Sequence, residues 1–151
     1  MAAVQDMGPG RSPIVRPHYP HFLAEDNGVW TRFLEQNFER LHEVWYDVKV
    51  GRPVKLDDNA TEMELRIARG VTRKRIDVVG WDGGSYWVIE VKPFASMLAV
   101  GQVISYARMF AMEYVIKGRV VPVIVCNTLD EDLTDEFKEL GILVIETEKK
   151  T

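Results

Sequence analysis

Cysteine and histidine are scarce in this chain and the net charge is negative, and each of these features excludes a class of protein. The 151 residues include one cysteine, Cys126, so no disulfide can form within the chain. With that cysteine and three histidines, the chain lacks a Cys/His set of the kind that holds zinc. The formal net charge of −4 argues against a protein that coats nucleic acid through its overall charge, although a local basic surface is compatible with it.

Long apolar runs are absent as well. The most apolar stretch, residues 96–116, is interrupted by Gln102, Arg108 and Glu113. It therefore falls short of the roughly 20 uninterrupted apolar residues that cross a bilayer. The N-terminus does not show the basic and then apolar pattern of a secretory signal. We therefore expect a cytoplasmic protein without a membrane partner.

The chain is expected to hold one domain behind an N-terminal arm. Residues 1–22 include four prolines and little periodicity, which predicts a flexible or extended arm. The remaining residues, 23–151, suit one domain with one core. Its first helix is expected from about Asp26, with an apolar face of Trp30, Phe33, Leu34, Phe38 and Leu41.

The later segments alternate between strand and helix patterns. Two strand patterns, 75–81 and 86–92, flank Asp82-Gly83, which predicts a hairpin. The helix expected over 95–116 is apolar almost all round, so we expect it to be largely buried. The order of elements predicts an α/β protein with a mixed sheet flanked by helices. The other expected elements are strands at 44–50, 119–127 and 142–148 and an amphipathic helix at 129–141.

Three charged residues stand inside the apolar hairpin strands. Glu90 and Lys92 are two residues apart, so their side chains project from one face of the strand. Asp77 is placed about opposite Glu90 by symmetry around the turn, where cross-strand Cβ atoms lie roughly 5 Å apart. Two close carboxylates repel each other, and a bound Mg²⁺ or Mn²⁺ removes that repulsion. The carbonyl of Val91 could add a metal ligand, and Lys92 could orient or deprotonate a water; the alternative is a structural ion-pair cluster.

The full pattern resembles the PD-(D/E)XK nuclease superfamily. Asp77 in RIDVVG, with Glu90 and Lys92 in WVIEVK, matches its hairpin motif. Gln102 and Tyr106 in GQVISYARMF match the QxxxY motif of the RecB-like branch. The family's proline before the aspartate is here an isoleucine. The resemblance covers about residues 26–147 and implies a restriction-endonuclease-like αβββαβ core and a DNA nuclease that uses Mg²⁺ or Mn²⁺.

The resemblance also implies the roles of further residues. The family often uses an acidic residue of the first helix, for which Glu35, Glu39 and Glu43 are candidates and Glu35 is preferred by its spacing and helical phase. Gln102 and Tyr106 would order the site or guide the strand, although such a pair can also satisfy backbone groups. A basic run is expected to contact DNA phosphates, or else to form a solvated face; it comprises Arg66, Arg69, Arg73, Lys74 and Arg75.

Several functional questions stay open at this stage. The main expectation is an endonuclease or exonuclease of DNA repair or recombination, of viral or prokaryotic type. The alternative is a subunit without catalysis that binds nucleic acid or assembles a repair, transposition or viral complex on the same fold. The substrate could be duplex, single-stranded or branched DNA, or RNA. The partners could include a second copy of the chain or a larger complex.

Overall fold

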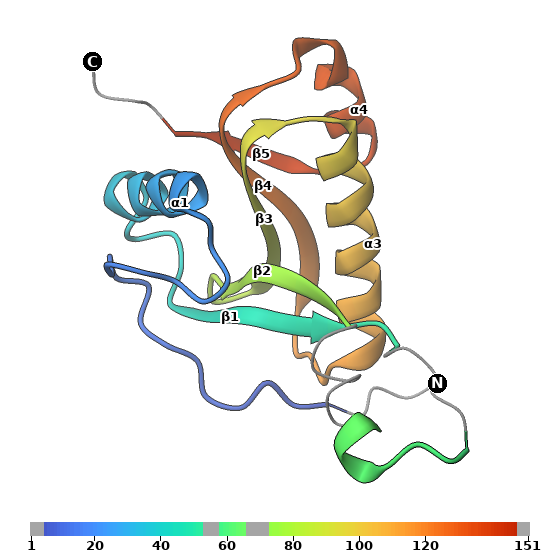
Figure 1. Ribbon diagram of the computed structural model, residues 1–151. Helices are drawn as coiled ribbons and strands as arrows, with labels where there is room; N and C mark the ends of the chain where they lie inside the picture. Colours follow the sequence, from blue (N-terminus) through green and yellow to red (C-terminus); the bar gives the residue numbers. More distant parts are fainter. Residues whose placement is uncertain (1–4, 53–57, 66–72, 148–151) are drawn as a thin grey trace.

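The computed structural model describes residues 5–52, 58–65 and 73–147, which form a mixed sheet with helices on both faces (Figure 1). Its strands lie in the order β1-β2-β3-β4-β5. β1, β2 and β3 are antiparallel neighbours, whereas β4 runs parallel to β3 and β5 parallel to β4. The expected α/β class with a mixed sheet is therefore confirmed. The elements are α1 (Ala24–Gln36), β1 (Glu43–Val50), β2 (Lys74–Trp81), β3 (Ser85–Ala95), α3 (Met97–Glu113), β4 (Arg119–Leu129), the 3-10 helix η1 (Glu131–Leu133), α4 (Thr134–Glu139) and β5 (Leu143–Glu146).

Side-chain alternation along β3 divides the core between the two faces of the sheet. Trp87, Ile89 and Val91 join the buried cluster of α1. Tyr86 and Val88 join the cluster of α3 on the opposite face. Glu90 and Lys92 continue the second series, so the strand pattern directs both charged side chains toward the α3 side.

The hairpin between β2 and β3 follows the expected turn. Gly83 has φ 101°, a backbone conformation that would be strained in a residue with a side chain. The Asp82 carboxylate accepts hydrogen bonds from the backbone N–H groups of Gly84 and Ser85 at 2.9 and 2.6 Å. It also accepts one from the Trp87 indole N–H at 3.0 Å. One aspartate thus holds the turn that aligns β2 with β3.

Two helix predictions need correction. α1 begins at Ala24 and ends at Gln36, so Phe38 lies beyond it and is 66% exposed. The expectation that the long helix is largely buried is wrong, because Met97 and Leu98 are 73% and 70% exposed. α3 packs against one sheet face only, and apolar composition does not tell how many neighbours a helix has.

The N-terminal arm is extended from residue 5 and lies along β1 (Figure 1). Arg11 exchanges backbone hydrogen bonds with Val44, and Gln5 bonds to the chain on both sides of Tyr114. Tyr19 is 4% exposed and belongs to the α1-side core. The arm thus covers the outer edge of the sheet. None of the helices in the described ranges combines the length and apolarity needed to span a membrane.

Candidate active site

The candidate site lies where the backbone pairing between β2 and β3 ends. Backbone pairing of the two strands runs from Trp81 and Tyr86 to Val78 and Ile89. Beyond that pair, the Val91 N–H donates to Asp77 Oδ2 at 2.8 Å. The Asp77 N–H lies 3.5 Å from Glu90 Oε1. At this position the backbone N–H groups are paired with side-chain carboxylates instead of the backbone carbonyls of the neighbouring strand. This pairing brings Asp77 and Glu90 together.

The two carboxylates are short of compensating positive charge. Glu90 is 2% exposed, and Lys92 Nζ lies 3.9 Å from its Oε2 atom. Burial raises the pKa of Asp77 to about 6, with a smaller opposing effect from the Val91 N–H and Lys92. Burial and then the charge of Asp77 raise the pKa of Glu90 well above its ordinary value. One partly exposed ammonium does not offset two desolvated carboxylates.

The donor atoms at this position suit a hard divalent cation. The N–H and C=O of a strand residue point toward the same neighbouring strand, so the Val91 carbonyl faces the gap that Asp77 enters. Two carboxylates and one carbonyl supply the oxygen ligands that Mg²⁺ and Mn²⁺ prefer. Across the residues described, no group of three or more His, Cys, Asp or Glu side chains is arranged to hold a metal. The protein ligands would be Asp77, Glu90 and Val91.

Two residues of α3 face the same region. Burial raises the pKa of Tyr106, and the charges of Glu90 and Asp77 add to that effect, which places its hydroxyl within electrostatic reach of both. Gln102 lies one helical turn earlier on the same helix face. Its buried Oε1 atom has no hydrogen-bond partner among the described residues. A buried, unpaired amide oxygen next to this region is available to a water or a substrate.

The acidic residue of α1 whose charge acts on Asp77 differs from the preferred candidate, Glu35. Glu35 lies on the last turn of α1 and is exposed. Asp26, in the first turn, contributes to the raised pKa of Asp77 through its charge. The sequence pattern marked Asp26 only as the approximate start of this helix. Its four-residue spacing from Trp30 could have revealed it, because that spacing puts both side chains on the core face.

The remaining candidates of the first helix lie elsewhere. Glu39 is exposed beyond the end of α1. Glu43 opens β1 and accepts a hydrogen bond from the Gly10 N–H at 2.6 Å. The structure brings neither of the two to the paired carboxylates.

The basic run divides into residues with different roles. Arg66 and Arg69 lie outside the described residues. Arg73 donates to the Gly51 carbonyl at 2.9 Å and pairs with Glu113 at 3.0 Å, so its guanidinium is engaged in the fold. Lys74 is exposed at the start of β2.

Arg75 belongs to a second polar cluster, beside the site, which the sequence did not reveal. Its guanidinium lies 3.5 Å from Asp47 Oδ2, and His21 Nε2 lies 3.0 Å from the same oxygen. Asp47 sits on β1 between the residues paired with Ile76 and Val78, so it lies across from Asp77. Asp47 and His21 have φ 54° and 61°, a conformation uncommon outside glycine. No sequence pattern links these residues, because the arm joins them only in the folded chain.

Comparison with known proteins adds no relative. No family model, no curated protein and no solved structure matches this chain.

Proposed function

We propose that this protein is a metal-dependent nuclease that hydrolyses DNA phosphodiester bonds at Asp77, Glu90 and Lys92. The observation that carries the proposal is the approach of Asp77, which is partly buried, to the buried Glu90, with Lys92 at the edge of the pair. The pKa values of both carboxyls are raised. Perturbed titratable groups that converge in this way are typical of functional sites. A structural ion pair with Lys92 needs only one carboxylate. Here there are two, and the single ammonium of Lys92 does not balance the charge of both.

The order of elements supports the same proposal. α1, β1, β2, β3, α3 and β4 follow the αβββαβ sequence of the restriction-endonuclease-like core. Asp77 lies on the first strand of the hairpin, and Glu90 and Lys92 lie on the second, as in the PD-(D/E)XK motif. Gln102 and Tyr106 lie on the following helix, as QxxxY does in the RecB-like branch. The proposed fold is therefore the restriction-endonuclease-like one.

Each residue has a chemical role in this proposal. Bound Mg²⁺ or Mn²⁺ would polarise the phosphate and make a coordinated water more acidic. Asp77, Glu90 and the Val91 carbonyl hold the ion. Lys92 orients the attacking water and stabilises the negative charge that develops on the phosphate oxygens. The Tyr106 hydroxyl and the Gln102 amide position the strand beside them.

The test is cleavage of a panel of labelled linear, circular, branched and single-stranded DNAs, and RNA, with Mg²⁺ or Mn²⁺. Asp77→Asn, Glu90→Gln and Lys92→Ala should each lower cleavage by at least about 100-fold, the scale of losing one positioned group. Thermal melting should show that these variants stay folded. Calorimetry should show that Asp77→Asn also weakens metal binding.

Two outcomes contradict the proposal. Full activity in any two of the three variants would remove the reaction from these residues. If the unaltered chain cuts none of the substrates with either metal, the protein is not a nuclease of this kind. Binding without cutting would favour a nucleic-acid-binding or assembly subunit on the same fold.

A further inference from the structure

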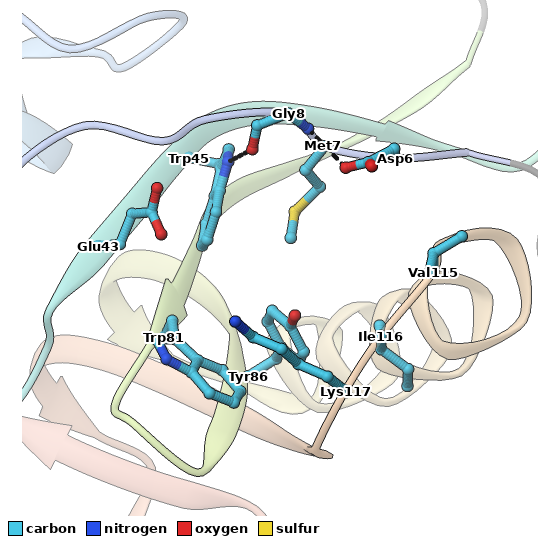
Figure 2. A pocket seen from close by; sticks show the side chains of 10 residues that line it. All are labelled: Asp6, Met7, Gly8, Glu43, Trp45, Trp81, Tyr86, Val115, Ile116 and Lys117. Carbon is cyan, nitrogen blue, oxygen red and sulfur yellow. Dashed lines mark hydrogen bonds between the residues drawn. The ribbon is translucent and has the colours of Figure 1, made fainter.

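A cavity of about 350 Å³ lies between the N-terminal arm and the β2–β3 hairpin, away from the paired carboxylates. Its walls include Trp45 of β1, Trp81 of β2 and Tyr86 of β3. Figure 2 shows the Trp45 ring on the arm side and the Trp81 and Tyr86 rings opposite, with the Lys117 side chain across them. The size falls within the range of small-ligand pockets, about 300–1,000 Å³.

The aromatic walls are held in place by close backbone contacts. The Trp45 indole N–H donates to the Gly8 carbonyl at 3.0 Å, which fixes its ring against the arm. A Cβ atom on Gly10 would come within 2.8 Å of the Trp45 ring, and one on Gly118 within 3.0 Å of the Trp81 ring. The chain thus needs glycine at both places to bring backbone against these rings. These contacts hold the Trp45 and Trp81 rings in place at the cavity walls.

Charged groups stand at defined places on these walls. The Lys117 ammonium lies 5.0 Å from the centre of the Trp81 ring, in a cation–π contact. Lys117 itself is exposed, so this contact is weak and easily exchanged. On the arm side, Glu43 uses its Oε2 atom to accept the Gly10 N–H. Among the described residues, none donates a hydrogen bond to its other carboxylate oxygen.

We propose that this aromatic cavity binds a nucleobase that carries a phosphate. A base that stacks on Trp81 displaces a weak cation–π contact and gains a stacking contact in its place. The displaced Lys117 ammonium is then free to bind the phosphate through a charge-assisted hydrogen bond. Glu43 can accept a hydrogen bond from an exocyclic amine, which adenine, guanine and cytosine have and thymine lacks. The ligand is either a free nucleotide or an unpaired base of a strand.

The cavity and the paired carboxylates share one face of the sheet. Tyr86 and Glu90 are four residues apart on β3, which corresponds to roughly 13 Å along the strand. Val88, between them, is buried under α3, so the two places are separate. The inference therefore goes beyond the proposed nuclease and does not depend on it.

The experiment measures quenching of tryptophan fluorescence in EDTA, which prevents any metal-dependent cleavage. The probes are dAMP, dTMP, adenosine, and oligonucleotides of six dA or six dT nucleotides. We expect dAMP to bind more tightly than dTMP, and adenosine, without phosphate, to bind more weakly than dAMP. Tighter binding of the oligonucleotide identifies an unpaired base of a strand as the ligand, whereas equal binding identifies a free nucleotide.

Two variants with matched controls test the residues. Trp81→Leu should weaken dAMP binding about tenfold or more, and its control is Phe38→Leu, an exposed aromatic outside the cavity. Lys117→Gln should weaken binding of dAMP but not of adenosine, and its control is Lys138→Gln on the exposed side of α4. Lys117 is exposed, so this variant stays informative if Trp81→Leu fails to fold.

Either of two results would overturn the inference. One is that the chain binds no nucleotide at millimolar concentration, and the other is that Trp81→Leu and Lys117→Gln both bind dAMP as the unaltered chain does. Repeating the titration with Asp77→Asn separates the two proposals. This variant is expected not to cut, and it should bind dAMP as the unaltered chain does. If the unaltered chain binds dAMP but cuts no substrate, the cavity assignment stands and the nuclease proposal fails. If it cuts DNA but binds no nucleotide, the reverse holds.

Discussion

Asp77 and Glu90 hold protons more tightly in the folded chain than in the unfolded one. Burial is the largest cause at both positions, and it raises the pKa of Asp77 from 3.8 to about 6. Between those two pH values the folded state binds more protons than the unfolded state. The free energy of unfolding therefore falls as pH rises through this window, by about 3 kcal/mol for Asp77.

This linkage predicts an unusual effect of neutralising the aspartate. Without metal, Asp77→Asn should be more stable than the unaltered chain at pH 7.5 and about equally stable at pH 4. The asparagine oxygen can still accept the Val91 N–H, so that hydrogen bond is retained. Urea unfolding in EDTA across this pH range measures the difference. If the free energy of unfolding changes with pH in the same way in both proteins, the raised pKa does not belong to Asp77.

The same experiment tests the metal site. At pH 7.5, Mg²⁺ should raise the stability of the unaltered chain, because an ion that binds only the folded state stabilises it by mass action. Asp77→Asn should respond much less. Equal responses in both proteins would place the cation elsewhere.

Asp26 and Glu35 of α1 can be separated by one comparison. The charge of Asp26 helps to raise the pKa of Asp77, so Asp26→Asn should lower that pKa. The pH window in which stability falls should then move toward lower pH. Glu35→Gln removes an exposed carboxylate of the same helix and should leave the window unchanged. A shift in the Glu35 variant alone would restore Glu35 as the residue of the site.

At the scale of elements, Arg73 connects β2 to the ends of β1 and α3. Its guanidinium binds Glu113 at the end of α3, and the Glu113 carboxylate accepts the Gly51 N–H at 2.9 Å. The Tyr114 hydroxyl donates to the Lys49 carbonyl at 2.6 Å nearby. These contacts stabilise the corner where β1 ends, so the basic run has at least one structural member.

Arg73 and Lys74 should therefore respond differently to replacement by alanine. Arg73→Ala should destabilise the fold by about 1–3 kcal/mol, because it leaves a partly buried carboxylate short of a donor. Lys74→Ala should leave stability within about 0.5 kcal/mol. If Lys74 contacts a phosphate, its loss should lower the slope of log affinity against log salt by about 0.9 on duplex DNA.

Urea unfolding and a salt titration of DNA binding in Ca²⁺ give both quantities. If the slope of log affinity against log salt is unchanged in both variants, the described part of the basic run makes no DNA contact. Equal stability of the two variants would contradict the structural role of Arg73.

At the scale of the whole molecule, the arm covers the outer edge of the sheet. The backbone of Arg11 satisfies both the N–H and the C=O of Val44, at 2.9 and 2.8 Å. Without these bonds β1 would present unpaired groups to solvent, and an open edge promotes pairing between chains. Tyr19, further along, belongs to the core and anchors the end of the arm.

Removal of residues 1–16 should therefore leave a folded protein that self-associates. Its free energy of unfolding should fall by roughly 2 kcal/mol, since at least two net hydrogen bonds are lost. Analytical ultracentrifugation over a range of concentrations measures the association, and removal of residues 1–4 alone is the control. A truncated chain that stays monomeric with unchanged stability would show that the arm does not protect this edge.

Local geometry made several features predictable from the sequence. Alternation in a strand puts Glu90 and Lys92 on one face whatever the rest of the chain does. Asp82 and Gly83 set the turn, and the turn determines that Asp77 comes to Glu90. The element order follows from hydrophobic periodicity in the same way. These are properties of neighbouring residues, which the sequence contains directly.

Contacts between distant segments were decided by the tertiary structure alone. The charge of Asp26, rather than that of Glu35, acts on Asp77 because of how α1 packs on the sheet. Arg73 is engaged because β2 starts beside the end of α3. The outer face of α3 is exposed because one sheet covers one side of it. Each depends on how separate elements pack, and local periodicity determines the elements but not their mutual positions.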